Sequence, residues 1–549
     1  MLRSAAALLI AAALTISALP DPGGALASGP STAQPRFERP LPVTPEGYEV
    51  SAREAKRIAD RTAAVAETIV RYGELTVRAE AKPSIWQVGY FSGEHEVAQV
   101  HVDSKTGAVG ESLTGHQVAW PMARGYEEQF GHKLNAPYVW IPLSLLFVCA
   151  LLDFQRLRKV VHLDLLVLLS FGVSHVYFNQ GEIGLSVPLV LPPLLYLLGR
   201  MAWIGFRGAG EGLRPSTPTW VLATFVLALV AARVALNVAD SGVIDVGYAG
   251  VIGADRITHG EAVYGSFPEE NPFGDTYGPA NYYAYVPFEA ALGWGGSWDE
   301  LPAAHAAAIF FDLATLAGLF ICGRRLFGAA LGVALCFAWA AYPYTTFALQ
   351  SNSNDTLVAA LLIWAFAAFS SPLGRGALLG LAAGVKFAPL ALAPLFAAGQ
   401  RGLADGLRSP GGRRALLGRT AVFAACLGGV LALLLAHPAV EPGLAAFWER
   451  TIATQLDRTS PFSVWGQEPS LEWLQRAFQV LAIGLALLVA FVPRRRTMAQ
   501  VAALAAAVMI AVELTADHWF YLYIPWFLPM MLLALCGRRG GGGLKPGRP

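Results

Sequence analysis

Residues 240–279 read DSGVIDVGYAGVIGADRITHGEAVYGSFPEENPFGDTYGP, a polar stretch in a chain that is otherwise apolar enough to lie in lipid. The stretch holds several tyrosines and seven carboxylates, which are Asp240, Asp245, Asp255, Glu261, Glu269, Glu270 and Asp275. Lipid cannot satisfy the backbone of a long loop, so this stretch must lie in water at a membrane face. Carboxylates gathered there are candidates for proton transfer. A solvated connector would have the same composition, and both interpretations stay open at this point.

The composition is that of a polytopic membrane protein. Of the 549 residues, 55% are hydrophobic and 14% are charged, with a mean hydropathy of +0.47, whereas soluble domains carry about 25% charged residues. The net charge is +1, and the short Lys and Arg runs between apolar segments give no basic cluster suited to nucleic acid. The five cysteines lie in or beside apolar segments without metal-ligand spacing. We therefore expect packing thiols, no disulfide framework, no metal site and no cofactor.

The chain begins with the features of an exported protein. Residues 1–27 resemble a secretory signal, because Arg3 precedes an apolar run and Ala-Leu-Ala precedes Ser28. An uncleaved anchor is the alternative. Residues 28–48 are rich in Pro and Gly and are predicted to be a linker.

A small α+β domain is predicted next. Ser51 and Glu54 have the spacing of a capping box and open a helix that runs to about Tyr72. Alternating stretches at 85–90 and 97–102 then predict strands, with a turn before Ala108.

This helix and meander, closed by VHVDSKTGAV at 100–109, resemble a PepSY-type domain over about residues 48–115. The resemblance implies a small extracytoplasmic binding or regulatory module rather than a catalytic one.

Apolar segments from about Pro137 onward predict a helical bundle, each near the length that crosses about 30 Å of hydrocarbon. We predict spans at roughly 137–153, 163–179, 184–204, 219–239, 302–322, 328–348, 354–370, 415–436, 476–492, 498–515 and 519–536. Two further apolar stretches, 280–298 and 376–398, are interrupted by Pro287, Glu289 and the Gly293–Gly296 run, and by Lys386, Pro389 and Pro394. The predicted class is a polytopic α-helical membrane protein, with about 11–13 transmembrane segments, preceded by a small α+β domain.

The basic connectors set the expected sidedness. With the N-terminal domain outside, every basic loop lies inside only if 280–298 does not cross and 376–398 returns to its own side as a broken hairpin. Broken backbone at membrane depth is tolerated against protein or a water-filled cavity. A crossing 280–298 is the alternative, and it would place one or more basic loops outside.

This topology collects polar segments on the outer face, at 240–279, 350–355, 437–472 and 517–519. An enzyme of this layout would take a membrane-anchored substrate. A carboxylate can take the proton of an attacking hydroxyl, and cations can offset the charge that grows on a leaving phosphate. The available cations are Lys386, Arg450, Arg458 and His518.

Each cation also has a structural interpretation. Lys386 could pair with Asp312, the two arginines could touch lipid headgroups, and the histidine could belong to a helix cap at the water interface. We interpret Asp312 and Arg233 as members of a structural ion pair rather than as catalytic residues. The tyrosine and tryptophan clusters at 282–285 and 519–523 are more typical of interfacial belts than of sugar platforms.

Four ordered elements together resemble GT-C glycosyltransferases, especially the family 87 mannosyltransferases. They are Asp245-x2-Tyr248 with Gly260-x3-Tyr264 and Thr276-Tyr277-Gly278-Pro279, then Gln350-x-Asn352, then GLAAGVKFAP at 380–389, then Ala516-Asp517-His518 before a span with Pro525 and Pro529. The resemblance covers about residues 219–536. It departs from the family at Gly278, where the family has proline, at Ser351 directly after Gln350, and in the three extra spans before residue 219.

The resemblance implies a polyprenyl-phosphate sugar donor with mannose as the first candidate, a lipid or glycan acceptor, and Asp245 as the catalytic base. Lys386 and His518 would contact the donor phosphate or the acceptor. The substrate-binding residues that we predict are Tyr248, Tyr277, Gln350, Asn352, Lys386, Arg450, Arg458 and His518. The site and the N-terminal domain would lie on the extracytoplasmic side of a cell membrane.

The predicted order of domains is a signal peptide at 1–27, a linker at 28–48, the PepSY-like domain at 49–135, accessory transmembrane helices at 136–218, the GT-C-like domain at 219–536 and a cytoplasmic Gly/Arg-rich tail at 537–549. Two other functions stay open. A transporter or flippase would also use a broken hairpin, although the inverted repeats of a carrier are not visible in the sequence. A sensor would have the N-terminal domain as its working part.

Overall fold

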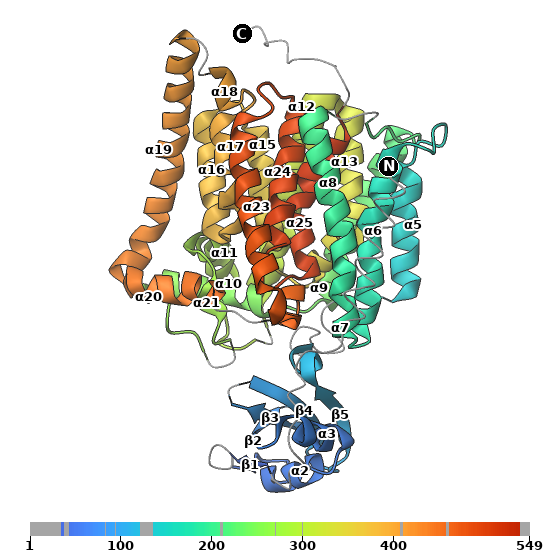
Figure 1. Ribbon diagram of the computed structural model, residues 1–549, viewed down its shortest axis with the longest axis vertical. Coiled ribbons are helices and arrows are strands. Elements are labelled where there is room, and N and C mark those ends of the chain that lie inside the picture. Colours follow the sequence, from blue (N-terminus) through green and yellow to red (C-terminus); the bar gives the residue numbers. More distant parts are fainter. Residues whose placement is uncertain are drawn as a thin grey trace. The chain divides into compact units, whose positions relative to one another are not determined.

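The computed structural model describes residues 35–37, 43–82, 84–93, 95–120, 136–208, 212–268, 271–298, 300–406, 410–456 and 460–537. The chain divides into two compact units (Figure 1). One comprises residues 1–124 with 173–189, and the other comprises residues 125–172 with 190–549. The predicted signal peptide and most of the predicted C-terminal tail lie outside the described residues.

The first unit begins with two short helices, α2 (Ala52–Ala59) and α3 (Ala63–Tyr72). Ser51 caps α2 as predicted, since its hydroxyl accepts from the Glu54 N–H. The single helix expected to run to Tyr72 is wrong. The chain breaks at Asp60–Thr62, where Thr62 takes an extended conformation and its hydroxyl caps α3 by accepting from Val65 N–H.

A five-stranded sheet follows, with the order β1 to β5. Its strands are β1 (Arg36–Phe37), β2 (Thr76–Lys82), β3 (Ile85–Ser92), β4 (His95–Asp103) and β5 (Val109–Thr114). The β2–β5 pairs are antiparallel, whereas β1 pairs parallel to β2. β1 lies in the stretch predicted to be a linker, and the sequence prediction missed β2.

One face of this sheet forms the core of the domain with the two helices. Ala55, Ala59 and Val65 from the helices are buried with Trp86, Val88, Tyr90 and Val100 from the strands. The predicted turn is held by Asp103, whose Oδ1 accepts from Thr106 N–H at 2.7 Å and Lys105 N–H at 3.0 Å. The short elements η1 (Gly115–Ala119) and α7 (Ile183–Ser186) also belong to this unit, and η2 (Pro188–Val190) ends one residue beyond it.

The second unit is a helical bundle. Its longer helices are α5 (Pro137–Leu151), α6 (Val160–Asn179, which ends in the first unit), α8 (Leu191–Arg207), α9 (Thr219–Asp240), α10 (Asp245–His259), α11 (Pro279–Leu292), α12 (Pro302–Phe327), α13 (Ala329–Ala341), α15 (Asp355–Ala367), α16 (Pro372–Val385), α19 (Pro410–Val440), α23 (Glu472–Phe491), α24 (Met498–Glu513) and α25 (Ile524–Leu535). The shorter elements are η3 (Gly274–Thr276), α14 (Pro343–Gln350), η4 (Ala388–Leu392), α17 (Ala393–Ala398), α18 (Leu403–Gly406), α20 (Leu444–Trp448), η5 (Glu449–Ala453), α21 (Thr454–Leu456), α22 (Val464–Gln467), η6 (Pro469–Leu471) and η7 (Tyr521–Tyr523).

The bundle has the dimensions of a membrane domain. Within the described residues, six helical segments are long and apolar enough to cross a bilayer, and the pair α13–α14, bent by 60°, makes a seventh if counted as one span. Shorter apolar helices of 10–17 residues lie at most of the other predicted spans. The predicted class, a polytopic helical protein preceded by a small α+β domain, is confirmed.

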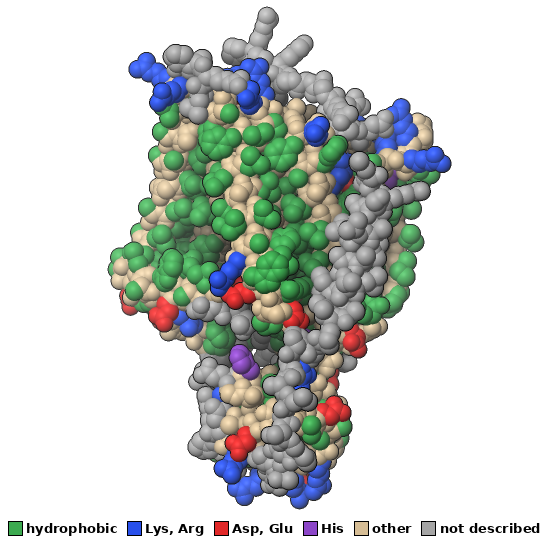
Figure 2. All heavy atoms as spheres, viewed as in Figure 1, with side chains coloured by type: hydrophobic (Ala, Val, Ile, Leu, Met, Phe, Trp, Pro, Cys, Tyr) green, Lys and Arg blue, Asp and Glu red, His purple; other side chains and the backbone are tan. Residues whose placement is uncertain are grey.

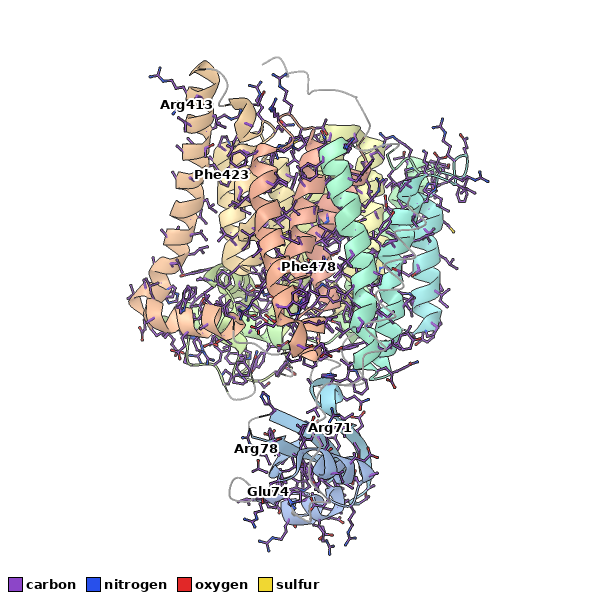
Figure 3. All side chains as sticks on the ribbon, viewed as in Figure 1. Arg71, Glu74, Arg78, Arg413, Phe423 and Phe478 are labelled. Atoms are coloured by element: carbon purple, nitrogen blue, oxygen red, sulfur yellow. The ribbon has the colours of Figure 1, made fainter. Side chains whose placement is uncertain are left out.

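The stretch 376–398 forms a hairpin. α16 ends at Val385, Lys386 takes an extended conformation, and η4 and α17 lead the chain back. The two ends of this hairpin meet, since Arg375 Nη2 donates to Ala397 O at 3.5 Å. The guanidinium of Arg375 also lies 5.9 Å from the ring of Phe423, a buried residue of α19 that Figure 3 labels.

The stretch predicted to be a polar loop is partly helical. Residues 245–259 form α10, and its positions 247–254 are buried. Glycine allows α10 to pack closely on α11, because a Cβ at Gly250 would lie 2.6 Å from the Tyr285 ring, and one at Gly253 would meet Tyr282. The loop interpretation was wrong here because it weighed the carboxylates and overlooked this apolar, glycine-spaced face.

Buried ion pairs join helices of the bundle. Arg233 of α9 donates to Asp312 of α12 at 2.9 Å, as the sequence favoured. Arg200 of α8 likewise contacts Asp164 of α6 at 3.0 Å. Figure 2 shows an apolar band along the bundle, with Lys and Arg side chains gathered at the end where α19 begins.

Candidate active site

An ammonium group enclosed by aromatic rings lies at the tip of the α16 hairpin. The Lys386 Nζ atom lies 5.0 Å from the centre of the Trp526 ring, 5.4 Å from that of Tyr523 and 5.6 Å from that of Tyr277. Lys386 also pairs with Asp355 at 2.5 Å. The Asp355 side chain is 1% exposed and that of Lys386 is 12% exposed, so the pair is reached from its lysine side.

Each member of this cluster comes from a chain break or a helix start. Lys386 follows the last residue of α16, and Pro389 prevents the helix from continuing unbroken. Asp355 is the first residue of α15, and its Oδ1 also accepts from Trp526 Nε1 at 2.8 Å. The stretch 240–279 is held against the hairpin by Gly278 N–H, which donates to Val385 O at 3.2 Å.

The alternative partner weighed for Lys386 was Asp312, and that alternative is wrong. Asp312 is occupied by Arg233 and by Trp339 Nε1, which donates at 2.8 Å. The two buried ion pairs of this region are therefore separate, and Lys386 belongs to the one that includes Asp355.

Arg450 forms a bidentate ion pair with a carboxylate of the stretch 240–279. Its Nε and Nη2 atoms each lie 2.7 Å from a carboxylate oxygen of Asp275, which is fully buried. Asp275 Oδ2 accepts in addition from Gly265 N–H at 2.6 Å. The pair raises the pKa of Arg450 through this hydrogen bond and charge, and it fastens η5 to the stretch 265–275. Arg458 lies outside the described residues.

Asp245 is the first residue of α10 and is exposed. Its backbone O accepts from Asn271 Nδ2 at 2.9 Å, and the preceding residue, Ile244, donates its N–H to Ser351 O at 3.2 Å. These bonds fix where the helix begins.

Gln350 and Asn352 are buried and hydrogen-bond within the chain. Gln350 Nε2 donates to Arg233 O at 3.1 Å, and Asn352 Nδ2 donates to Gly242 O at 2.9 Å. Asn352 has a left-handed backbone with φ of 50°, which asparagine tolerates better than most residues. The two side chains thus hold the segment that leads into α10.

Tyr248 and His518 lie among aromatic rings. Tyr248 is buried and stacks on Trp298 with 4.7 Å between ring centres. His518 Nδ1 lies 2.9 Å from Ser460 Oγ, and its ring centre lies 6.1 Å from that of Tyr523. Since Tyr523 also faces Lys386, the histidine and the lysine border the same tyrosine.

Residues 276–534 match the family model of glycosyltransferase family 87. Over this segment the chain is similar to glycosyltransferase family 87. No protein in a comparison with curated proteins matched this chain.

The family 87 segment contains Asp355, Lys386, Arg450, His518 and the aromatic residues around them. It begins after α10, so Asp245 and Tyr248 lie upstream of the matched residues. The match indicates a membrane glycosyltransferase, and the geometry shows which polar groups of this segment lie together.

Sequence reasoning missed two residues of the lysine cluster, Asp355 and Trp526. Both stand beside motifs that it singled out, since Asp355 follows the Gln350–Asn354 run and Trp526 follows Pro525. A carboxylate at the start of an apolar span was the available signal, because an intramembrane charge requires a partner. Among the described residues, no group of three or more His, Cys, Asp or Glu could hold a metal ion.

Proposed function

We propose that this glycosyltransferase transfers a sugar, with mannose the first candidate, from a polyprenyl-phosphate donor to a lipid or glycan acceptor on the extracytoplasmic face of a cell membrane. The family 87 match over residues 276–534 carries the reaction class. The lipid-linked donor rests on the placement of polar groups at the end of an apolar bundle, where a membrane-anchored substrate presents its head group.

In the proposed step, an acceptor hydroxyl oxygen attacks the anomeric carbon of the donor sugar. The bond between that carbon and the phosphate oxygen breaks, and the phosphate leaves with the bonding electron pair. Asp245 takes the proton of the attacking hydroxyl, so that no charged oxonium forms on the acceptor. Attack opposite to the leaving phosphate inverts the anomeric centre.

The burial and ion pairing of two other carboxylates support the choice of Asp245 as the base. Asp275 and Asp355 are buried and each is paired with a cation, so accepting a proton would break an ion pair that holds Arg450 or Lys386 in place. Asp245 is exposed at the start of α10, where a substrate can reach it.

The remaining predicted residues fall into two proposed roles. The first role is to contact the donor head group, and it falls to Lys386, Tyr277 and His518. Lys386 lies near the rings of Tyr277 and Tyr523, and His518 lies beside Tyr523, so the three residues are close together. The other role is to position α10 and the stretch 240–279 around the substrate. It falls to Gln350, Asn352, Tyr248 and the Arg450–Asp275 pair. Arg458 keeps its proposed contact with the substrate phosphate.

The test is incubation of membranes containing the protein with labelled polyprenyl-phosphate sugars, followed by extraction of glycolipids and glycans. A new labelled product is expected from wild type, and Asp245→Asn should lower its rate by about 10²–10⁴-fold with donor binding retained. Asp240→Asn should be milder. Turnover near the wild-type rate in Asp245→Asn would remove Asp245 from this role.

The hairpin broken at Lys386 also favours a second candidate, a carrier that moves a lipid-linked precursor. A carrier would move labelled lipid between leaflets of a vesicle without changing it chemically. Recovery of the donor unchanged, but on the other face, would therefore replace the transferase proposal.

A further inference from the structure

Two buried asparagines face each other beside the Lys386–Asp355 pair. Asn354 Nδ2 donates to Asn281 Oδ1 at 2.8 Å, and both side chains have no exposed surface. Asn354 directly precedes Asp355 at the start of α15. Asn281 lies in the first turn of α11, four residues after Tyr277, whose ring faces Lys386.

This amide pair is incompletely hydrogen-bonded. Asn281 Nδ2 and Asn354 Oδ1 are buried and have no hydrogen-bond partner. Leaving a buried donor or acceptor unsatisfied costs about 1–3 kcal/mol each, and buried amides are nearly always paired. The pair therefore holds one unused donor and one unused acceptor on adjacent amides. Flipping both side-chain amides by 180° still leaves one unpaired donor and one unpaired acceptor, because the donor then lies on Asn354 and the acceptor on Asn281.

The neighbouring ion pair suits a neutral ligand better than an anion. Asp355 cancels the charge of Lys386 at 2.5 Å, so the cluster as a whole attracts a phosphate weakly. A carboxylate and an ammonium beside aromatic rings can instead bind hydroxyl groups, since the carboxylate accepts, the ammonium donates and the rings cover apolar sugar faces.

From these contacts we infer that Asn281, Asn354 and Asp355 form a recognition subsite for the hydroxyl groups of the transferred sugar. One hydroxyl accepts from Asn281 Nδ2 and a neighbouring hydroxyl donates to Asn354 Oδ1. The sugar enters from the lysine side of the cluster, between the rings of Tyr277 and Tyr523. This inference rests on the proposed function, and it adds which residues select the sugar.

The test is a cycle that pairs enzyme variants with altered donors, using the full-length protein in membranes. The donors are the polyprenyl-phosphate sugar with the highest turnover, mannose first, and its analogues that each lack one ring hydroxyl. The variants are Asn281→Leu and Asn354→Leu. Thr356→Val is the matched control, because Thr356 is also buried with an unpartnered hydroxyl two residues from Asn354.

Each leucine variant should lower kcat/KM for the complete donor by roughly ten- to a hundredfold, from the loss of one buried hydrogen bond. One analogue, which lacks the hydroxyl bound by the substituted asparagine, should lower kcat/KM of wild type by the same factor. The variant should show no further loss of kcat/KM with that analogue. Thr356→Val should reproduce the wild-type ranking of analogues. If a leucine variant is not recovered in the membrane, Asn281→Asp replaces it, since the carboxylate keeps the size and removes the donor.

The outcomes separate the two ideas. Suppose that wild type transfers sugar, but for every hydroxyl removed the loss of kcat/KM in the variant and the loss with the analogue multiply. The two changes are then independent, so this subsite is refuted while the transferase proposal stands. If wild type transfers sugar from no polyprenyl-phosphate donor, the proposed function fails and this subsite fails with it.

Discussion

Lys386 and Asp355 give a prediction that separates stability from activity. Lys386→Met leaves the Asp355 carboxylate, which is 1% exposed, without its ammonium partner, while Trp526 Nε1 still donates to it at 2.8 Å. Removing one partner of a buried ion pair costs about 3–5 kcal/mol, whereas replacing both partners by apolar residues of similar size is often neutral. We therefore expect each single variant, Lys386→Met and Asp355→Leu, to unfold well below wild type. The double variant should recover most of that loss.

Activity should not recover with stability. Both side chains contact the donor in the proposed site, so the double variant should fold and insert but stay at least a hundredfold below wild type in turnover. The assay is thermal unfolding of the detergent-solubilised protein beside transfer of labelled sugar in membranes. Additive losses of stability in the double variant would refute the ion-pair argument. Restored turnover would show that the pair is purely structural.

The Arg233–Asp312 pair is the matched control for this experiment. It is also buried between helices, with exposed fractions of 3% and 2%, and lies outside the lysine cluster. Replacing both members, by Arg233→Met with Asp312→Leu, should retain both folding and turnover. The same cycle on the two pairs thus distinguishes a pair that contacts substrate from one that joins α9 to α12.

Three further predictions concern packing, sidedness and pH. Gly250→Ala should lower turnover about tenfold or more by pushing α10 from the Tyr285 ring at a cost of about 1–3 kcal/mol, whereas Gly429→Ala, with open space around its Cβ, should be neutral in the same transfer assay. A single cysteine at Ser266, which is exposed, should react with an impermeant thiol reagent from outside intact cells, and labelling only after permeabilisation would overturn the sidedness. Burial raises the pKa of Glu96 in the N-terminal domain to about 7, so between pH 4.5 and 7 the folded domain keeps a proton that the unfolded chain has released. The free energy of unfolding of residues 35–120, measured by chemical unfolding, should therefore fall by up to about 3 kcal/mol as the pH rises from 4.5 to 7. Glu96→Gln should flatten this pH dependence.

The spans could be predicted because lipid imposes length and polarity on each helix independently of its neighbours. The predicted segment 219–239 is α9 at Thr219–Asp240, and 302–322 is the first part of α12 at Pro302–Phe327. The hairpin at Lys386 was equally visible, because two prolines and a charge inside an apolar run leave each half too short to cross. These are local constraints.

What could not be predicted is which charge meets which. Lys386 had an aspartate available on each of two helices, and the sequence separation from Lys386 to Asp312 or Asp355 carries no information on the fold. The choice is made by α15, which begins at Asp355 beside the end of α16, and by Trp526 from the last helix. Tertiary packing sets both, so the identity of the partner emerged only in three dimensions.

The same reasoning explains why the prediction of a solvated loop at 240–279 was wrong. Its carboxylates suggested a solvated loop, yet Asp275 is fully buried under Arg450 and residues 247–254 pack as α10. A buried carboxylate paired to a cation costs desolvation, which the fold offsets with three hydrogen bonds to the Asp275 oxygens. Those bonds hold the stretch that carries Tyr277 against the lysine cluster, while α10 holds Asp245 at its start. Acidic residues of one segment therefore divide into the buried Asp275, which the fold uses to hold the chain, and the exposed Asp245, which we propose as the base. Burial distinguishes the two carboxylates, and composition does not reveal burial.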